Sequence, residues 1–523
     1  MRERERRRAS VILAGGPVIV AGLVLAGARM AAATTPVAPA GALFDPRRPP
    51  ERELEMSVAD GFTLAAVGDC IISRPLAPLL KREAAFAAVV GILREADAAF
   101  GNLETSIIDI RGFKGSPQGG ADDWSLVSLP EVAQDLKALG LDLVSRANNH
   151  AMDWGVEGMR ETGARLDEAG LVHAGAGETR AQARAARYLE TGMGRVGLVS
   201  MSSSLAERAT ALPPAGEAPG RPGLNALRTT RTTIVTGAMM EALVGLGRSM
   251  ETAGAECAAR IGGSGARAPA TAVAGTSASA RGKPDEASPG KVPEEITLFD
   301  TTFRIGERPG YHYAMDPIDL AENLRSIRQG KQHSDFLVAT IHAHETGLGC
   351  DEPGDFLPVF AHAAIDAGAD AFLGHGVHHL GPIEIYKGRP IFYGLGNFIW
   401  SDIQEPIAAD LYERHRDLLA AAFGDPSKAT DADLTALLNA AGFNDELVFQ
   451  TIVAVSRFAG GRLSEIRLYP VDLGYGLKLT KSGVPRRAAP ALARTILERL
   501  QRISRPYGTT IGIEDNVGLI RPR

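Results

Sequence analysis

Carboxylate, amide and imidazole side chains recur along this chain where apolar segments end. They are Asp69, Glu104, the run Asn148-Asn149-His150, His342 with His344 and Glu345, and His375 with His378. Proteins use these side chains to bind Mn, Fe or Zn, and one carboxylate can bridge two such ions. We therefore interpret them as candidate ligands of one or two divalent metal ions.

Each motif also has a structural explanation when it is taken alone. Gly68-Asp69 after an apolar segment is typical of a turn, and one asparagine of the 148–150 run fits a helix cap. The glycines around His375 fit a glycine-rich turn. However, six of the eleven histidines lie in only three of these motifs, namely His150, His342, His344, His375, His378 and His379. This clustering favours a common metal site over independent surface histidines.

The segments that carry these residues alternate between strand and helix patterns. Short apolar runs that predict buried strands are 62–67, 98–100, 141–145, 171–174, 195–200, 336–341 and 371–373. Segments with apolar residues at helical spacing are 84–96, 130–139, 156–169, 317–329 and 357–367. Such alternation predicts an α/β fold with a largely parallel sheet covered by helices, and the polar residues then lie at strand ends, where chemistry often occurs.

The pattern also divides the chain. The predicted core extends over residues 59–400, includes a hairpin around Lys387-Gly388, and is interrupted at about 205–294 by a segment rich in small residues. Within that insertion, 234–246 has helical spacing, whereas 264–290 is low in complexity and is expected to be disordered and dispensable for stability. Residues 401–523 are predicted to form a C-terminal α+β appendage with helices, two strands and a final helix over 489–503.

Composition excludes some classes of protein. The chain has 523 residues, a formal net charge of -6 from 56 basic and 62 acidic residues, and three cysteines. The lack of a basic excess argues against nucleic acid as a partner. Three scattered cysteines form neither a disulfide framework nor a CxxC metal site.

The N-terminus has the pattern of an export signal. Five arginines precede the apolar run 11–26, and three alanines follow at 31–33. We expect residues 1–33 to be a signal peptide or an uncleaved anchor that associates with the membrane, and 34–58 to be a linker. Arg7-Arg8 favours the twin-arginine route, with ordinary secretion as the alternative. Both routes place the protein outside the cytoplasm, in the periplasm or cell envelope.

The order of the motifs resembles a known family. GDCIISR, FGNLETSI, RANNHAMDWGVEG, HAGAGE, TIHAHE and GHGVHHLGPIEIYKGRPIFYGLGNFIW are similar to motifs of the poly-γ-glutamate capsule synthesis family, CapA. That family is related to calcineurin-like metallophosphoesterases. The resemblance covers roughly residues 60–200 and 295–400, and RLYPVDLGYG and YGTTIGIED resemble its C-terminal region. It implies a layered metallophosphatase-like core with mainly parallel strands.

The resemblance also implies roles for individual residues. The implied metal ligands are Asp69, Glu104, Asn149, His342, His375 and His378. Glu104 stands where metallophosphoesterases have a bridging aspartate. His150 falls at the position of the acid that protonates the leaving group, and Arg74 at that of an arginine facing an anionic substrate. The first motif lacks the usual histidine two residues after Asp69, so one metal position has one ligand fewer.

These features predict a metal-dependent phosphoesterase-like hydrolase that takes part in capsule synthesis or export. Its expected cofactors are one or two Mn, Fe or Zn ions, and its expected partners are a phosphoester or an anionic polymer and other capsule synthesis and export proteins. Two alternatives remain open at the level of sequence. One is a non-hydrolytic accessory protein that binds the anionic polymer, and the other is a metal-dependent γ-glutamyl peptidase.

Overall fold

The computed structural model describes residues 56–118, 125–261, 292–349, 351–403, 409–442 and 445–522. The expected signal peptide or anchor, nearly all of the expected linker, and the low-complexity segment 264–290 lie outside the described residues. Among the helices that are described, none is long and apolar enough to cross a membrane.

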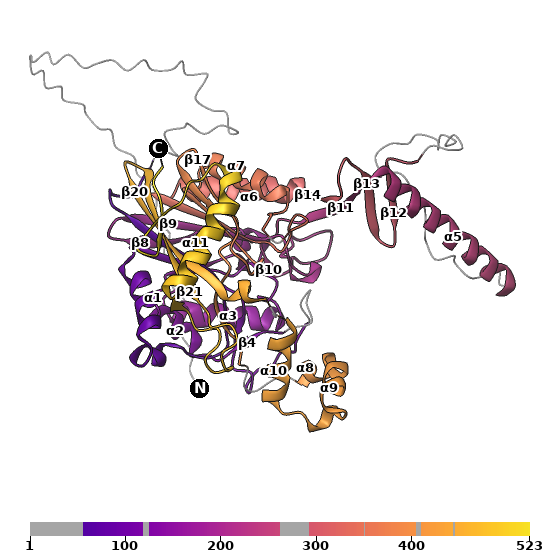
Figure 1. Cartoon of the computed structure of the whole chain (residues 1–523), viewed down its shortest axis with the longest axis horizontal. Coiled ribbons are helices and arrows are strands. Elements are labelled where there is room, and N and C mark those ends of the chain that lie inside the picture. Colours follow the sequence, from indigo (N-terminus) through magenta and orange to yellow (C-terminus); the bar gives the residue numbers. More distant parts are fainter. Residues whose placement is uncertain are drawn as a thin grey trace, which may run out of the picture. The chain divides into compact units, whose positions relative to one another are not determined.

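The larger sheet has ten strands (Figure 1). Strands β19, β1, β2, β5 and β6 are parallel, whereas β20, β21, β22, β24 and β23 continue the sheet in antiparallel pairing. The parallel strands are β1 (Thr63–Ile72), β2 (Ala98–Leu103), β5 (Leu143–Ser145), β6 (Val172–Ala174) and β19 (Asn397–Ser401). The antiparallel strands are β20 (Gln450–Ala459), β21 (Arg462–Asp472), β22 (Arg486–Arg487), β23 (Gly512–Glu514) and β24 (Val517–Ile520).

A second sheet has six strands in the order β17-β18-β16-β15-β9-β8. Its four central strands are parallel and its two edge strands are antiparallel. The strands are β8 (Arg187–Thr191), β9 (Gly194–Ser202), β15 (Phe336–His342), β16 (Ala371–His375), β17 (Ile383–Tyr386) and β18 (Arg389–Phe392). Strands β17 and β18 form the predicted hairpin, which turns at Lys387-Gly388.

The two sheets pack face to face with helices outside. One apolar cluster contains inward side chains of both sheets, including Leu64, Phe100, Val338 and Leu373. Helices α1 (Ala84–Glu95), α2 (Val132–Ala138) and α3 (Gly155–Glu168) cover the larger sheet, and α6 (Pro317–Lys331) and α7 (Phe356–Asp366) cover the smaller one (Figure 1). The layered α/β fold class is confirmed, but the strands predicted to share one sheet form two.

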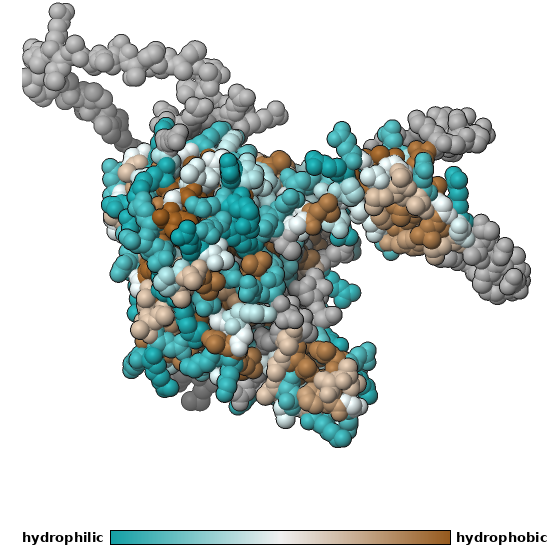
Figure 2. Space-filling model, viewed as in Figure 1, coloured by the Kyte–Doolittle hydropathy of each residue, from teal (hydrophilic) through white to brown (hydrophobic). Residues whose placement is uncertain are grey.

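Part of the insertion predicted at about 205–294 forms a small α/β unit together with residues 295–315. Strands β11 (Thr229–Val235), β12 (Glu295–Leu298), β13 (Thr301–Ile305) and β14 (Gly310–Met315) form a four-stranded sheet that packs on α5 (Gly237–Ile261). The helix predicted over 234–246 begins instead at Gly237, and Ile234 lies in β11. The β-branched run before Thr236 favours a strand, which explains the difference. Figure 2 shows apolar side chains gathered on this unit, where Met239 and Phe299 are exposed.

The segment after residue 400, predicted as an appendage, contributes strands to the larger sheet. Strand β20 pairs with the first half of β1, next to the stretch where β19 pairs with its second half. Helix α11 (Pro490–Ser504) buries Ile496 and Leu500 in the cluster between the sheets. Only α8 (Ala409–Arg414), α9 (Arg416–Phe423) and α10 (Asp431–Gly442) form a cluster of their own, with buried leucines 411, 419, 434 and 438.

Short elements complete the connections between these layers. They are β3 (Ser106–Ile107) with β4 (Val127–Ser128), β7 (Ala176–Gly177) with β10 (Gly223–Leu224), and α4 (Arg180–Ala183).

Candidate metal centre

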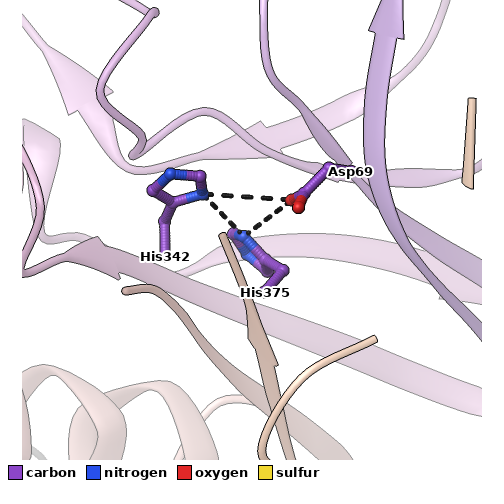
Figure 3. A group of neighbouring side chains, drawn as sticks. All are labelled: Asp69, His342 and His375. Atoms are coloured by element: carbon purple, nitrogen blue, oxygen red, sulfur yellow. Dashed lines mark hydrogen bonds and ion pairs between the residues drawn. The ribbon is translucent and has the colours of Figure 1, made fainter. Parts of the chain in front are cut away.

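Two groups of metal-ligand side chains lie where the carboxyl ends of strands from both sheets meet. The first group is Asp69, His342 and His375, and the second is Glu104, His344 and His378. Within each group the candidate ligand atoms all lie within 4.8 Å of one another. Figure 3 shows the Asp69 carboxylate from β1 facing the imidazoles that end β15 and β16. Both groups can therefore hold a metal ion.

The sequence predicted that Asp69 follows the end of a strand. In the structure Asp69 instead lies inside β1, at an irregularity of the strand. The strand continues to Ile72, and its register with β2 and with β19 shifts next to Asp69. Such a bulge redirects a side chain. A Cβ atom on Gly68 would meet the carbonyl oxygen of Gly396 at 1.8 Å, and the Asp69 amide donates to that same oxygen at 2.9 Å. Glycine is therefore required beside Asp69.

The carboxylate of Asp69 is fully buried and surrounded by donors. It accepts hydrogen bonds from Asn102 Nδ2 at 2.8 Å and from the Gly376 amide at 3.1 Å, and Nδ1 of both His375 and His378 lies 3.4 Å away. Burial alone raises the pKa of Asp69, but the hydrogen bonds and charges of the two histidines outweigh it and hold this pKa well below its usual value. Asp69 is thus an anion near neutral pH and a candidate ligand for a cation.

His342 connects the two groups. Its Nδ1 lies 3.0 Å from Nδ1 of His375, and its Nε2 lies 2.9 Å from Nε2 of His344 and 3.6 Å from Oε1 of Glu104. Burial, and then the neighbouring histidines, hold the pKa of His342 well below its usual value, so the ring is neutral near pH 7. Imidazoles whose nitrogens converge beside two buried carboxylates form a donor set that suits divalent transition metals.

His378 is held by its backbone and by Asn397. The residue has a positive φ of 59°, an uncommon conformation that is often found at functional sites. Its Nδ1 lies 2.8 Å from Oδ1 of Asn397, whose Nδ2 donates to the Val448 carbonyl at 3.1 Å. The Trp400 ring packs edge-on against the imidazole at 5.5 Å. These contacts fix the ring's orientation, as outer contacts do around metal ligands.

The three residues that follow β5 in the run Asn148-Asn149-His150 have different surroundings. Asn148 Nδ2 donates to Oδ1 of Asn102 at 3.1 Å and to the Leu103 carbonyl at 2.7 Å, and its Oδ1 accepts from the His150 amide at 3.1 Å. Asn148 therefore joins this loop to β2. Asn149 is 4% exposed, and its role as a ligand stays a prediction.

His150 has a buried carboxylate partner. Its Nδ1 lies 2.8 Å from Oδ2 of Asp153, and the same carboxylate oxygen accepts the Leu126 amide at 2.8 Å. Asp153 is fully buried, and His150 is 6% exposed. Donation from Nδ1 to Asp153 orients the ring and places its proton-exchanging nitrogen at Nε2, an arrangement typical of acid–base histidines.

Arg74 makes its contacts with residues other than the predicted metal ligands. Its Nη2 donates to the Thr480 carbonyl at 3.1 Å, and burial lowers the pKa of its guanidinium. In the described part of the chain, no hydrogen bond or ion pair joins Arg74 to the predicted ligands. Its role toward a substrate stays a prediction.

Comparison with known proteins identifies the family. Residues 63–402 match the family described as bacterial capsule synthesis protein PGA_cap. The chain belongs to this family. It is 47% identical over 475 residues to the uncharacterized protein y4sH of Sinorhizobium fredii, covering 89% of this chain and 94% of the relative. It is 23% identical over 344 residues to the PGA biosynthesis protein CapA of Bacillus subtilis, covering 65% of this chain and 64% of that protein.

A hypothetical protein from Thermus thermophilus is similar in structure at 14% identity and a TM-score of 0.34, covering 79% of this chain and 99% of that one. This likeness is too distant to bear on activity.

This capsule synthesis protein has a cavity of about 530 Å³ whose lining includes Ser203 and Thr229. Two of its lining residues, Ser203 and Thr229, donate side-chain hydrogen bonds to Glu345 at 2.7 and 3.2 Å. Glu345 directly follows His344, and the Ser203 amide donates to the His342 carbonyl at 3.0 Å. The cavity therefore lies next to the segment that carries His342 and His344, and its volume suits a small ligand.

Three polar residues with defined contacts to candidate site residues were not predicted as site residues. Asn102, Asn397 and Asp153 support ligand candidates or His150. The sequence position gave a signal for two of these three residues. Asn102 lies two residues before Glu104 in FGNLETSI, and Asp153 lies three residues after His150. Asn397 is brought to the site by the fold. His344, a candidate by its residue type to which the resemblance gave no role, completes the second group.

Proposed function

We propose that this protein is a metal-dependent hydrolase that acts on an anionic substrate, most simply a phosphoester, in the synthesis or export of a poly-γ-glutamate capsule. The observation that carries the proposal is the pair of carboxylate–histidine groups joined by His342. Membership of the capsule synthesis family supports the biological setting.

One or two Mn, Fe or Zn ions fit this donor set, with Asp69, His342 and His375 at one position and Glu104, His344 and His378 at the other. When bound, such ions neutralise substrate charge and lower the pKa of water. The protein's part is to hold the ligands rigidly: Asn102 and Gly376 fix Asp69, and Asn397 fixes His378. Asn149 remains a further candidate ligand.

In this proposal His150 donates a proton to the leaving group from Nε2, while Asp153 stabilises the imidazole through Nδ1. The neighbouring cavity takes the part of the substrate beyond the reacting group. Arg228 lines it, and its guanidinium is fixed by two hydrogen bonds to the buried Asp319, at 2.7 and 2.8 Å.

The proposed location is the periplasm or cell envelope. Support comes from the arginine-rich N-terminus with its apolar run and from the relatives named as capsule biosynthesis proteins. The partners we propose are other capsule synthesis and export proteins, with association to the membrane through the N-terminus.

The test is to incubate the purified protein with phosphoesters and with poly-γ-glutamate, each with Mn and with a chelator. We expect Mn-dependent release of phosphate and loss of activity on chelation. Cleavage of the polymer without phosphate release would replace the proposal with a γ-glutamyl peptidase. If neither substrate is cleaved while the polymer still binds, the protein is a non-hydrolytic accessory protein.

A further inference from the structure

A second cavity, of about 450 Å³, lies beside the smaller sheet between α4, strands β8 and β9, and α6. Three arginines and a histidine line it, namely Arg184, Arg195, Arg325 and His333. Among its described lining residues there is no aspartate or glutamate. This basic lining contrasts with the net charge of -6 of the whole chain.

The charge in this cavity is only partly compensated. Arg184 Nη1 lies 3.3 Å from Glu322, and Arg195 Nε lies 2.8 Å from Glu190, whose side chain is 72% exposed. Within the described residues, no ion pair involves Arg325. An exposed ion pair is weak in water, so an incoming anion can replace Glu190 at little cost.

Two of the lining side chains, those of Arg195 and His333, are held in place before any ligand binds. The Arg195 guanidinium lies 4.5 Å from the centre of the Tyr188 ring, and its Nη1 donates to the His333 carbonyl at 3.3 Å. The His333 ring is in turn held by its Nδ1, 2.8 Å from the Gln329 carbonyl. Such preorganisation lowers the entropy cost of binding an anion.

The cavity is far from the candidate metal centre. Arg195 lies near the start of β9, and Ser202, at the end of the same strand, pairs with His342. Seven residues of a parallel strand span about 23 Å. A small ligand bound in this cavity therefore cannot also contact the candidate metal centre. A flexible chain can reach from the cavity to the metal centre.

We propose that this cavity is a separate binding site for carboxylate groups of an acidic polymer chain. Arginine forks bind carboxylates with two parallel hydrogen bonds, and the cavity is large enough for a short segment of such a chain. The choice of polymer rests on the proposed function, while the site itself rests on the lining arginines. Inorganic phosphate offers related chemistry and serves as the competing probe.

The experiment measures binding of a fluorescent γ-glutamate oligomer to the full chain by anisotropy, at two salt concentrations. Arg325→Glu and Arg195→Ala should each weaken binding at least about tenfold and reduce its dependence on salt. The matched control is Arg494→Glu on α11, an exposed arginine that pairs with Glu498 at 2.7 Å. Circular dichroism melts show whether each variant is folded.

Unchanged affinity in both cavity variants would overturn the proposal, and so would an equal loss in Arg494→Glu, since that would indicate attraction by general surface charge. Binding of phosphate without binding of the oligomer would also overturn the polymer assignment. The measurement does not depend on turnover, so a failure of the proposed hydrolase activity leaves its outcome intact.

Discussion

The buried Asp69 is the residue on which the proposed metal centre depends most. It is fully buried among His342, His375 and His378, and its carboxylate supplies the negative charge that a cation in the first group would balance. We expect Asp69→Asn and His375→Ala to lower the metal content of the purified protein strongly. Elemental analysis measures this.

The matched control for metal content is His362→Ala. This histidine lies on α7, stacks on Tyr386 and pairs with Glu384 at 2.9 Å, away from both groups. Its replacement should leave the metal content unchanged. If Asp69→Asn retains as much metal as the control does, the assignment of the first group is wrong.

His150 should behave differently from a ligand. We expect His150→Asn to retain metal but to lower turnover by roughly 10²–10⁴-fold, because proton transfer to the leaving group is lost. The loss should shrink for a nitrophenyl ester, whose leaving group departs without a proton. Steady-state kinetics with a poor and a good leaving group measure the difference, and equal losses with both would exclude the acid role.

Asp153 is expected to act through His150 as a positioning residue. Asp153→Asn removes the negative charge beside Nδ1, and that charge favours the protonated imidazole that donates the proton. The limb of the pH–rate profile that reports the acid should then move to lower pH while metal content stays constant. A variant that loses activity with an unmoved profile would indicate a purely structural role.

At the scale of elements, the start of α1 is joined to the C-terminal region by ion pairs. Glu83 precedes the helix, and its carboxylate lies 3.0 Å from Lys481 and 2.6 Å from Arg486. Burial alone raises the pKa of Glu83, but the hydrogen bonds and charges of these two cations outweigh it and lower the pKa below its ordinary value. The pairs thus connect segments about 400 residues apart in the sequence.

This pKa shift predicts a pH-dependent stability. A lowered carboxyl pKa stabilises the fold fully above the ordinary value, and the stabilisation is lost as the pH falls through the lowered one. We therefore expect Glu83→Gln to cost about 1.5–3 kcal/mol at pH 7, the range for hydrogen bonds to charged groups. The difference from the parent should shrink as the pH falls below the ordinary value of about 4.5 and should vanish only below the lowered pKa of Glu83. Denaturant unfolding measures it, with the exposed Glu95→Gln as control, and a difference that persists at low pH contradicts the prediction.

At the scale of the whole molecule, the C-terminal strands complete the core sheet. Strand β20 pairs with residues 63–66 of β1 and buries Ile452 and Ala454 in the cluster between the sheets. We expect a chain truncated after residue 403 to lose its cooperative unfolding transition and its metal, because β1 loses a neighbour and apolar surface becomes exposed. Differential scanning calorimetry and elemental analysis measure both.

The control for truncation is a chain in which a Gly/Ser linker replaces residues 409–442. Helices α8, α9 and α10 bury their leucines in a cluster of their own, so the core transition should persist. If instead the truncated chain melts like this control, the C-terminal strands are an appendage after all.

The sequence by itself determined the types of the main elements, the order of the motifs and most of the candidate ligands. Helix and strand patterns are local, because they depend on side chains within about a dozen residues, and α1, α3, β15 and β16 therefore lie almost where they were predicted. The family resemblance assigned roles to these candidates on the same basis, since motifs are also local.

Only the tertiary structure decided how these elements meet. The division into two sheets, the place of β20 beside β1, the pairing of His344 with His378 and the contact of Arg74 with Thr480 depend on interactions that no local pattern encodes. The hydrogen bond from Gly376 to Asp69 joins residues 307 positions apart. Such contacts are selected by the burial and hydrogen bonding of the whole fold, which is why the candidate ligands were visible in the sequence and their grouping was not.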